Sequence, residues 1–350
     1  MRLCNTKLTA LALAAALPVG AQAADNITLY GKARLSVDFT DTGASNVTKV
    51  SDAISRLGVK GTEDLGNGLK AIFQMETGVN MDDGAGKTGT LFGGGRNSFV
   101  GLAGGFGTVA LGIHDSPYRM STGKMAVFSD TMGDYRNIIG SISTGGGTKF
   151  FQREPNTVNY WSPKFDGLQF RAQYRAGEVS GVNQDRYSLS GTYDSGPFAV
   201  GLAYEKHNRE GSGGKNDTQG LKAGLGYTFQ EKTKLGLVYE KLSESGAATA
   251  FDRNAWYASL AHNIGDNTVS LAYGRAGNNA LASNTGANFY LAGLSHRLSK
   301  RTEVYALYAK TRNDSGAQYG LAPGASSGAV AVAVAGQDPS TFSIGINHDF

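Results

Sequence analysis

The sequence has one cysteine, at position 4, among its 350 residues. A single cysteine excludes a disulfide-stapled fold and a zinc site built from cysteines. Proline is also scarce, with 7 residues, and charged residues make up 18% of the chain, against a usual share of about 25%. Basic residues outnumber acidic ones by only 33 to 29. This small excess does not indicate nucleic-acid binding, and we expect no nucleic-acid partner.

Long hydrophobic runs are missing as well. The longest largely apolar stretch is residues 8–19, which is shorter than the roughly 20 residues that a helix needs to cross hydrocarbon. It follows Arg2 and Lys7 and is followed by the sequence Ala21-Gln22-Ala23. This is the pattern of a secretory signal peptide. We expect residues 1–23 to be cleaved and residues 24–350 to form a single domain without a membrane-spanning helix.

Glycine is abundant, with 50 residues, and aromatic residues make up 10% of the chain. Glycine inside a helix costs roughly 1 kcal/mol relative to alanine, so this composition disfavours a mostly helical fold. The aromatic content also disfavours a disordered chain. The composition therefore favours a β-rich body.

The polarity of the sequence alternates with a period of two. Residues 27–39 alternate without exception, and the pattern recurs in residues 168–175, 221–229, 234–240 and 342–350. Successive side chains of a strand point to opposite faces, so these segments predict strands with one apolar and one polar face.

Two folds bury such strands, a soluble sandwich and a barrel in lipid. Sandwich strands typically have about 5–6 residues, whereas a tilted strand needs about 9–11 to span a bilayer, as these runs do. Charged residues stay on the polar face, as expected where a lipid-facing Arg or Lys would cost about 2–4 kcal/mol. The sequence therefore predicts an all-β, transmembrane antiparallel β-barrel.

Short and long connections alternate along the chain. Seven short turns are expected at residues 63–68, 104–106, 163–167, 195–197, 230–233, 265–267 and 299–302. Eight longer loops are expected near residues 40–54, 79–95, 115–152, 176–185, 207–218, 243–253, 276–287 and 313–339. Seven turns and eight loops join about 16 strands, and a barrel of that size encloses an aqueous channel.

Residues 55–71, SRLGVKGTEDLGNGLKA, resemble the N-terminal signature of Gram-negative general diffusion porins, in particular the neisserial and bordetella type. Further similar segments, in the same order and spacing, are residues 96–102, 105–109, 156–163 and 298–305. The likeness extends from the signal peptide to the last residue.

This resemblance implies a homotrimer in the outer membrane that lets ions and small hydrophilic solutes diffuse passively. It also implies that a long third loop, here near residues 114–152, folds into the lumen. The terminal Phe350 resembles the assembly signal that the barrel-insertion machinery reads. Neither the resemblance nor the residues predict a cofactor, a metal site or an enzymatic activity.

Porins of this family oppose arginines on the barrel wall to carboxylates on the inward loop. Arg56 and Arg153 match wall arginines of the family motifs, and alternation places Lys32, Arg34 and Lys60 on the wet face. A charged ring inside low-dielectric walls focuses the electric field and sets ion preference. Arg34 and Lys60 are equally compatible with ordinary lumen polar residues.

The loop offers Asp115, Asp130 and Asp134 as carboxylates, although the last two also suit plain turn positions. The family usually has an arginine where this chain has Ile113, and alternation would put Ile113 on the lipid side. The neighbouring His114 is by default neutral near pH 7. With one wall cation missing, we expect only a weak anion preference.

Two other functions remain open. A solute-specific porin would line the lumen with a binding track of aromatic and charged residues. An outer-membrane lipase or protease would use Ser326 in the pattern Gly324–Gly328, but no helix follows it as a nucleophile elbow requires.

Overall fold

The computed structural model describes residues 26–84, 95–142, 150–209, 215–246, 252–321 and 327–350. The expected signal peptide and Ser326 lie outside these described residues. Within them, no helix is long and apolar enough to cross a membrane.

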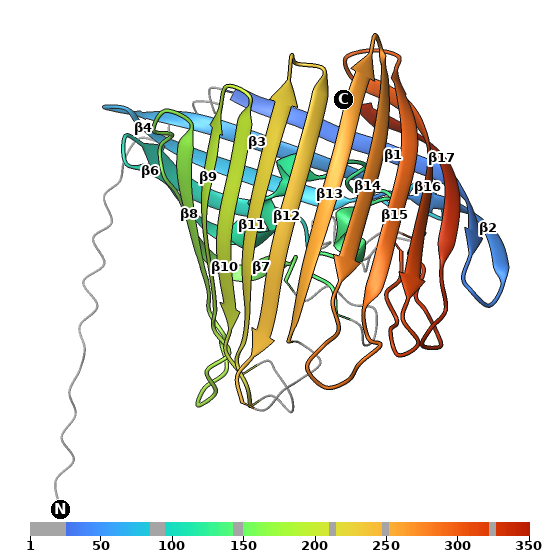
Figure 1. Cartoon of the computed structure of the whole chain (residues 1–350). Coiled ribbons are helices and arrows are strands. Elements are labelled where there is room, and N and C mark those ends of the chain that lie inside the picture. Colours follow the sequence, from blue (N-terminus) through green and yellow to red (C-terminus); the bar gives the residue numbers. More distant parts are fainter. Residues whose placement is uncertain (1–25, 85–94, 143–149, 210–214, 247–251, 322–326) are drawn as a thin grey trace, which may run out of the picture.

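The described chain consists mainly of strands connected in sequence order. Their bounds are β1 Asn26–Asp41, β2 Asn46–Asp52, β3 Arg56–Gly66, β4 Leu69–Gly78, β5 Ser98–Gly104, β6 Gly107–Asp115, β7 Arg153–Trp161, β8 Leu168–Arg175, β9 Arg186–Ser195, β10 Phe198–His207, β11 Thr218–Phe229, β12 Thr233–Glu244, β13 Arg253–Ile264, β14 Asn267–Ala276, β15 Ala287–Arg297, β16 Thr302–Asn313 and β17 Ser340–Asp349. Neighbouring strands pair antiparallel throughout the described sheet (Figure 1).

These 17 segments make 16 wall strands because β2 and β3 are one strand with an interruption. Both pair with β1, β3 along its first half and β2 along its second. Between them lies Ile54, whose φ of 68° breaks the extended backbone. Pairing of β1 with β17, from Lys32 opposite Asp349 to Asp41 opposite Ser340, closes the sheet. The predicted 16-stranded closed barrel is confirmed.

The first long connection differs from the prediction. A polar loop was expected near residues 40–54, but β1 and β2 run through most of this range and leave residues 42–45 as the connection. Val47, Thr48 and Val50 are β-branched and favour extended backbone. The turn itself is made by Gly43, with φ 82°, whose N–H donates to Asp41 Oδ1 at 2.8 Å.

The two faces of the wall have opposite chemistry. Large apolar side chains are exposed on the outside, as Leu29 at 64% and Phe39 at 49% illustrate, whereas the inward Asp38 is fully buried. A soluble protein exposes polar groups and buries apolar ones, so this inversion fits a wall surrounded by lipid.

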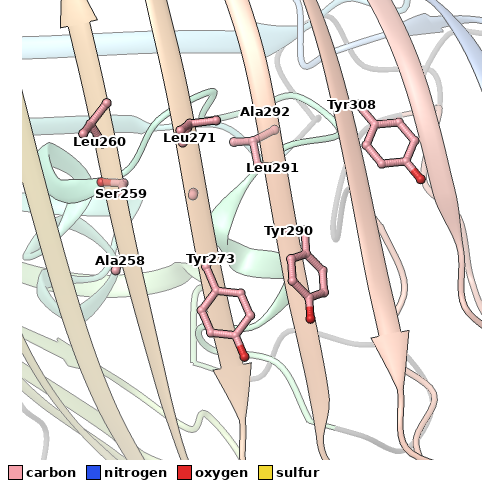
Figure 2. Close-up of a pocket in the computed structure, with 10 residues that line it drawn as sticks. Ala258, Ser259, Leu260, Leu271, Tyr273, Tyr290, Leu291, Ala292 and Tyr308 are labelled. Carbon is pink, nitrogen blue, oxygen red and sulfur yellow. The ribbon is translucent and has the colours of Figure 1, made fainter.

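Tyrosines mark one band of the outer face. Tyr273, Tyr290 and Tyr308 border a shallow outward groove of about 430 Å³ whose floor includes Ala258 and Ala292 (Figure 2). Such aromatic girdles occupy the membrane interface of barrels.

The last residue is tied to the first strand. The backbone of Phe350 exchanges two hydrogen bonds with Gly31, of 2.9 and 3.0 Å. A Cβ at position 31 would lie 2.3 Å from the Phe350 ring, so only glycine leaves room for the terminal aromatic side chain.

Candidate functional site

The longest connection begins after β6 with three short helical turns. They are α1 Pro117–Met120, η1 Gly123–Met125 and η2 Tyr135–Asn137. Ser116 caps α1 by accepting from the Arg119 N–H, and Pro117 suits the first helical position. We call residues 116–142 and 150–152 the inner segment. Its helical turns lie between the near and far walls of the barrel (Figure 1).

Buried charges attach the inner segment to β12 and β13. The fully buried Glu240 accepts hydrogen bonds of 2.8 Å from the Gly140 N–H and from the Tyr118 hydroxyl. Arg253 lies 3.0 Å from Glu240 and donates to the Ile138 carbonyl at 3.0 Å. A buried charge is tolerated when it is paired and hydrogen-bonded, as both of these are.

Apolar contacts and small wall residues complete the attachment. Tyr135 packs against Tyr257 of β13 with ring centroids 5.5 Å apart, and both are buried. Gly201 and Gly236 let the backbone of the segment approach the wall closely. A Cβ on Gly236 would lie 2.4 Å from the Met125 carbonyl oxygen, and one on Gly201 would lie 2.1 Å from that of Ser121.

The wall residue Arg34 meets the carboxylate Asp130 of the inner segment, with 3.3 Å between Nη1 and Oδ2. Arg136 of the segment bridges Asp130 at 2.9 Å and Asp134 at 2.7 Å. Burial alone would raise the pKa of Asp130, but the charges of Arg136 and Arg34 outweigh it and lower that pKa below its ordinary value. Asp134 also caps η2 by accepting from the Arg136 N–H.

Arg153 meets Asp115, with 3.1 Å between Nη2 and Oδ1, and Arg119 approaches the same carboxylate at 3.0 Å. Asp115 is the last residue of β6, so it lies on the wall and not on the loop to which the sequence assigned it. Asn97 accepts from Arg153 Nε at 2.7 Å and holds the guanidinium in place.

The other three predicted wall cations pair away from the inner segment. Arg56 lies 3.6 Å from Glu76 of β4, which Arg96 approaches at 2.7 Å. Lys32 pairs with Asp349 at 2.8 Å. Lys60 lies over the Tyr30 ring, 5.3 Å from its centroid. Among the described residues, none of these cations pairs with a carboxylate of the segment.

The wall is irregular where the family arginine is absent. The register of β6 against β7 shifts between Gly112 and His114, and Gly112 has φ 144°. Beyond the shift, the His114 ring packs against Trp161 and Phe99, with centroids 4.8 and 5.4 Å away. His114 therefore belongs to an aromatic cluster.

Sequence reasoning missed several charged residues. Glu76, Arg96, Arg119 and Arg136 belong to the ion pairs just described. Arg96 begins the family-like segment 96–102, but the sequence assigned no role to any of the four. It also did not identify a buried group formed by His207, Glu154 and Glu205, whose side-chain nitrogen and oxygen atoms lie within 4.8 Å of one another. Long sequence separation hides that group, and Arg186 pairs with Glu154 there.

Cations exceed carboxylates along this lumen network. Six arginines take part, Arg34, Arg56, Arg96, Arg119, Arg136 and Arg153, against four carboxylates, Glu76, Asp115, Asp130 and Asp134. We call these ten residues the charged network. Its formal charge of six positive and four negative groups is +2.

The chain matches a family model described as Gram-negative porin over residues 8–317. It is 34% identical over 264 residues to the major outer membrane protein P.IB of Neisseria gonorrhoeae, covering 73% of this chain and 69% of that protein. It is 29% identical to the outer membrane porin protein 32 of Delftia acidovorans, covering 98% and 99%.

Among solved structures, the anion-selective porin from Comamonas acidovorans is similar, with a TM-score of 0.80, 28% identity and coverage of 93% of this chain and 99% of that one. The trimer form of OmpT from Vibrio cholerae has a TM-score of 0.65 at 17% identity, covering 93% and 99%, a likeness of fold alone. With its outward apolar wall and closed 16-stranded sheet, this chain belongs to the Gram-negative porin family of the outer membrane.

Proposed function

We propose that the protein forms a water-filled channel through which ions and small hydrophilic solutes diffuse passively, with a weak preference for anions. The observation that carries the preference is the excess of six arginines over four carboxylates in the charged network. Fixed charges inside low-dielectric walls act on a passing ion more strongly than they would in open water.

The inner segment, within the expected loop 114–152, acts in this proposal as the constriction. One side of it is attached to β12 and β13 through Glu240 and Arg253, and the other presents Asp130 to Arg34. Permeating ions then pass between Arg34, Arg56 and Arg153 on the wall and the carboxylates opposite. Carboxylates alternating with arginines keep the net field modest, which supports a weak preference.

The wider biology follows the family. We propose that residues 1–23 direct export and are cleaved, that the barrel assembles as a homotrimer, and that Phe350 is recognised by the insertion machinery. The trimer proposal is supported by the trimer form of OmpT, which shares the fold. Because porins are channels, the proposal includes no enzymatic activity, cofactor or metal.

The test is conductance across a planar bilayer. Protein refolded without its first 23 residues should insert as open channels whose conductance rises almost in proportion to KCl concentration, because the pore is water-filled. A correctly folded barrel that carries no current would contradict the proposal. Conductance that saturates at low salt would favour a channel with a tight ion-binding site.

A further inference from the structure

A second set of basic residues lies apart from the charged network, near the short turns. Residues 162–167, between β7 and β8, and residues 196 and 197, between β9 and β10, are short connections. Short turns mark the periplasmic end of outer-membrane barrels. Close to them, a cavity of about 150 Å³ lies between the start of the inner segment and the inner faces of β8 to β10.

The cavity is lined by more positive than negative charge. Lys124 of the inner segment, Lys164 of the short turn and Arg171 of β8 contribute cations, and Asp194 is the one carboxylate among its lining residues. Lys124 pairs with Asp194. Among the described residues, Lys164 and Arg171 have no carboxylate partner, which leaves two positive charges for a ligand.

Neutral polar side chains surround the same space. Arg171 is held by hydrogen bonds to Gln169 Oε1 at 2.5 Å and to Thr192 Oγ1 at 3.3 Å. Both of these residues line the cavity, as does Ser121. A guanidinium fixed by two side chains is already oriented for an anion, which lowers the cost of binding.

We propose that this cavity binds a phosphate-type oxyanion, either inorganic phosphate or the terminal phosphate of a phosphomonoester. A water molecule occupies about 30 Å³ of liquid, so the cavity holds one phosphate and a few waters. Arginine recognises two phosphate oxygens at once through its planar fork, while lysine adds a point charge. This site would add a specific oxyanion-binding position to the proposed anion-preferring channel. It depends on that proposed function only for the route by which anions reach the cavity.

The natural reporter is Trp161. Its Cα is the register partner of Arg171 across β7 and β8, and its ring lies with His114 and Phe99 inside the wall. The only other tryptophan, Trp256, is on the outer face and 38% exposed. The variant Trp256→Phe therefore isolates the inward signal.

The experiment titrates inorganic phosphate into refolded Trp256→Phe protein at constant ionic strength, with chloride as the balancing anion. We expect a saturable change in Trp161 fluorescence. Adding Arg171→Gln should raise the half-saturating concentration about tenfold or more, as expected for losing a hydrogen bond to a charged group. Lys164→Gln should raise the half-saturating concentration by a smaller factor. Because Lys164 lies on an exposed turn, this second variant still tests the site if the Arg171 variant does not fold.

The control is Lys241→Gln, which removes the same charge from the exposed outer face of β12 and should leave the titration unchanged. Glycerol phosphate in a parallel arm separates the two ligand sources. If glycerol phosphate half-saturates the site at a lower concentration than inorganic phosphate does, the ligand is a phosphomonoester. If it needs a higher concentration, the ligand is the free phosphate ion. A response that is linear, that chloride reproduces, or that survives both Arg171→Gln and Lys164→Gln would overturn the site. This readout needs no current, so a non-conducting barrel would defeat the proposed function and leave this test intact.

Discussion

The charged residues near the inner segment differ in water exposure between the two sides of the barrel. On β12 and β13, Glu240 and Arg253 are withdrawn from water and hold the segment by direct hydrogen bonds. On β1 and β7, Arg34 and Arg153 keep 15% and 14% of their side chains exposed while they pair with carboxylates. Under the proposed function, similar charged residues therefore have two roles: those withdrawn from water hold the segment, and those that water reaches act on ions.

The largest expected effect is on the anchoring side. Glu240→Ala leaves Arg253 buried without its partner, which should lower the free energy of unfolding by about 3–5 kcal/mol. Urea unfolding followed by tryptophan fluorescence measures this. Glu63→Ala, at an exposed position of β3, is the matched control and should change stability little. Equal effects of the two variants would show that Glu240 does not anchor the segment.

The second-largest effect on stability is expected at Gly236, where the inner segment lies close to the wall. Gly236→Ala places a Cβ 2.4 Å from the Met125 carbonyl oxygen, whereas at Gly226 the nearest atom would lie at an ordinary 3.4 Å. Overpacking of this kind typically costs about 1–3 kcal/mol. Gly236→Ala should therefore destabilise the barrel and alter single-channel conductance, and Gly226→Ala should do neither. A normal channel from Gly236→Ala would mean that the segment does not contact the wall there.

Substitutions in the pair of Arg34 and Asp130 should change ion selectivity more than stability. Arg34→Gln should reduce the ratio of anion to cation permeability, and Asp130→Asn should increase it, each by a factor of up to about 5. A unit charge about 4 Å from an ion contributes about 1 kcal/mol in water. Reversal potentials in a KCl gradient measure both, and unfolding midpoints should stay nearly constant because partly exposed pairs contribute little. Shifts of the same sign in the two variants would contradict this pairing.

The smallest effect concerns pH. Because Arg136 and Arg34 lower the pKa of Asp130, this carboxylate should stay charged from neutral pH down past the ordinary value of about 3.9. Its stabilising contribution is present above that unfolded value and is lost as the pH falls through the lower folded one. The anion preference should be constant above about pH 5 and rise only in stronger acid, as carboxylates lose charge. Asp130→Asn should reduce that rise; a rise already between pH 7 and 5 would contradict the assignment.

The fold could be predicted because lipid imposes a strict rule on every strand. Alternation in residues such as 27–39 indicated the outward and inward faces, and the count of short turns and long loops indicated the strand number. The prediction failed at residues 40–54, where strands project beyond the region in which alternation is enforced. Their polar residues resemble a loop in composition, yet hydrogen bonds between β1 and β2 satisfy the backbone.

The site could be predicted only in part. Alternation placed Arg34 inside, where it meets Asp130. Glu76 shares the polar phase of β4 with Gln74, but Ile72 interrupts that phase, so the alternation is not strict there. Arg119 and Arg136 belong to an aperiodic segment, and no period marked them. Alternation also placed Lys32 and Lys60 on the inner face, but Lys32 pairs with Asp349 and Lys60 lies over the Tyr30 ring, away from the inner segment. Alternation gives the face of a residue, but its position along the pore axis and its partner depend on the three-dimensional path of the segment.

The proposed anion preference is tested by the zero-current potential of the unmodified channel across a tenfold KCl gradient at neutral pH. A charged network whose six arginines outnumber its four carboxylates should give a small potential of the sign that marks chloride as the more permeant ion. A potential of the opposite sign, or one indistinguishable from that of a neutral pore, would contradict the role assigned to these arginines.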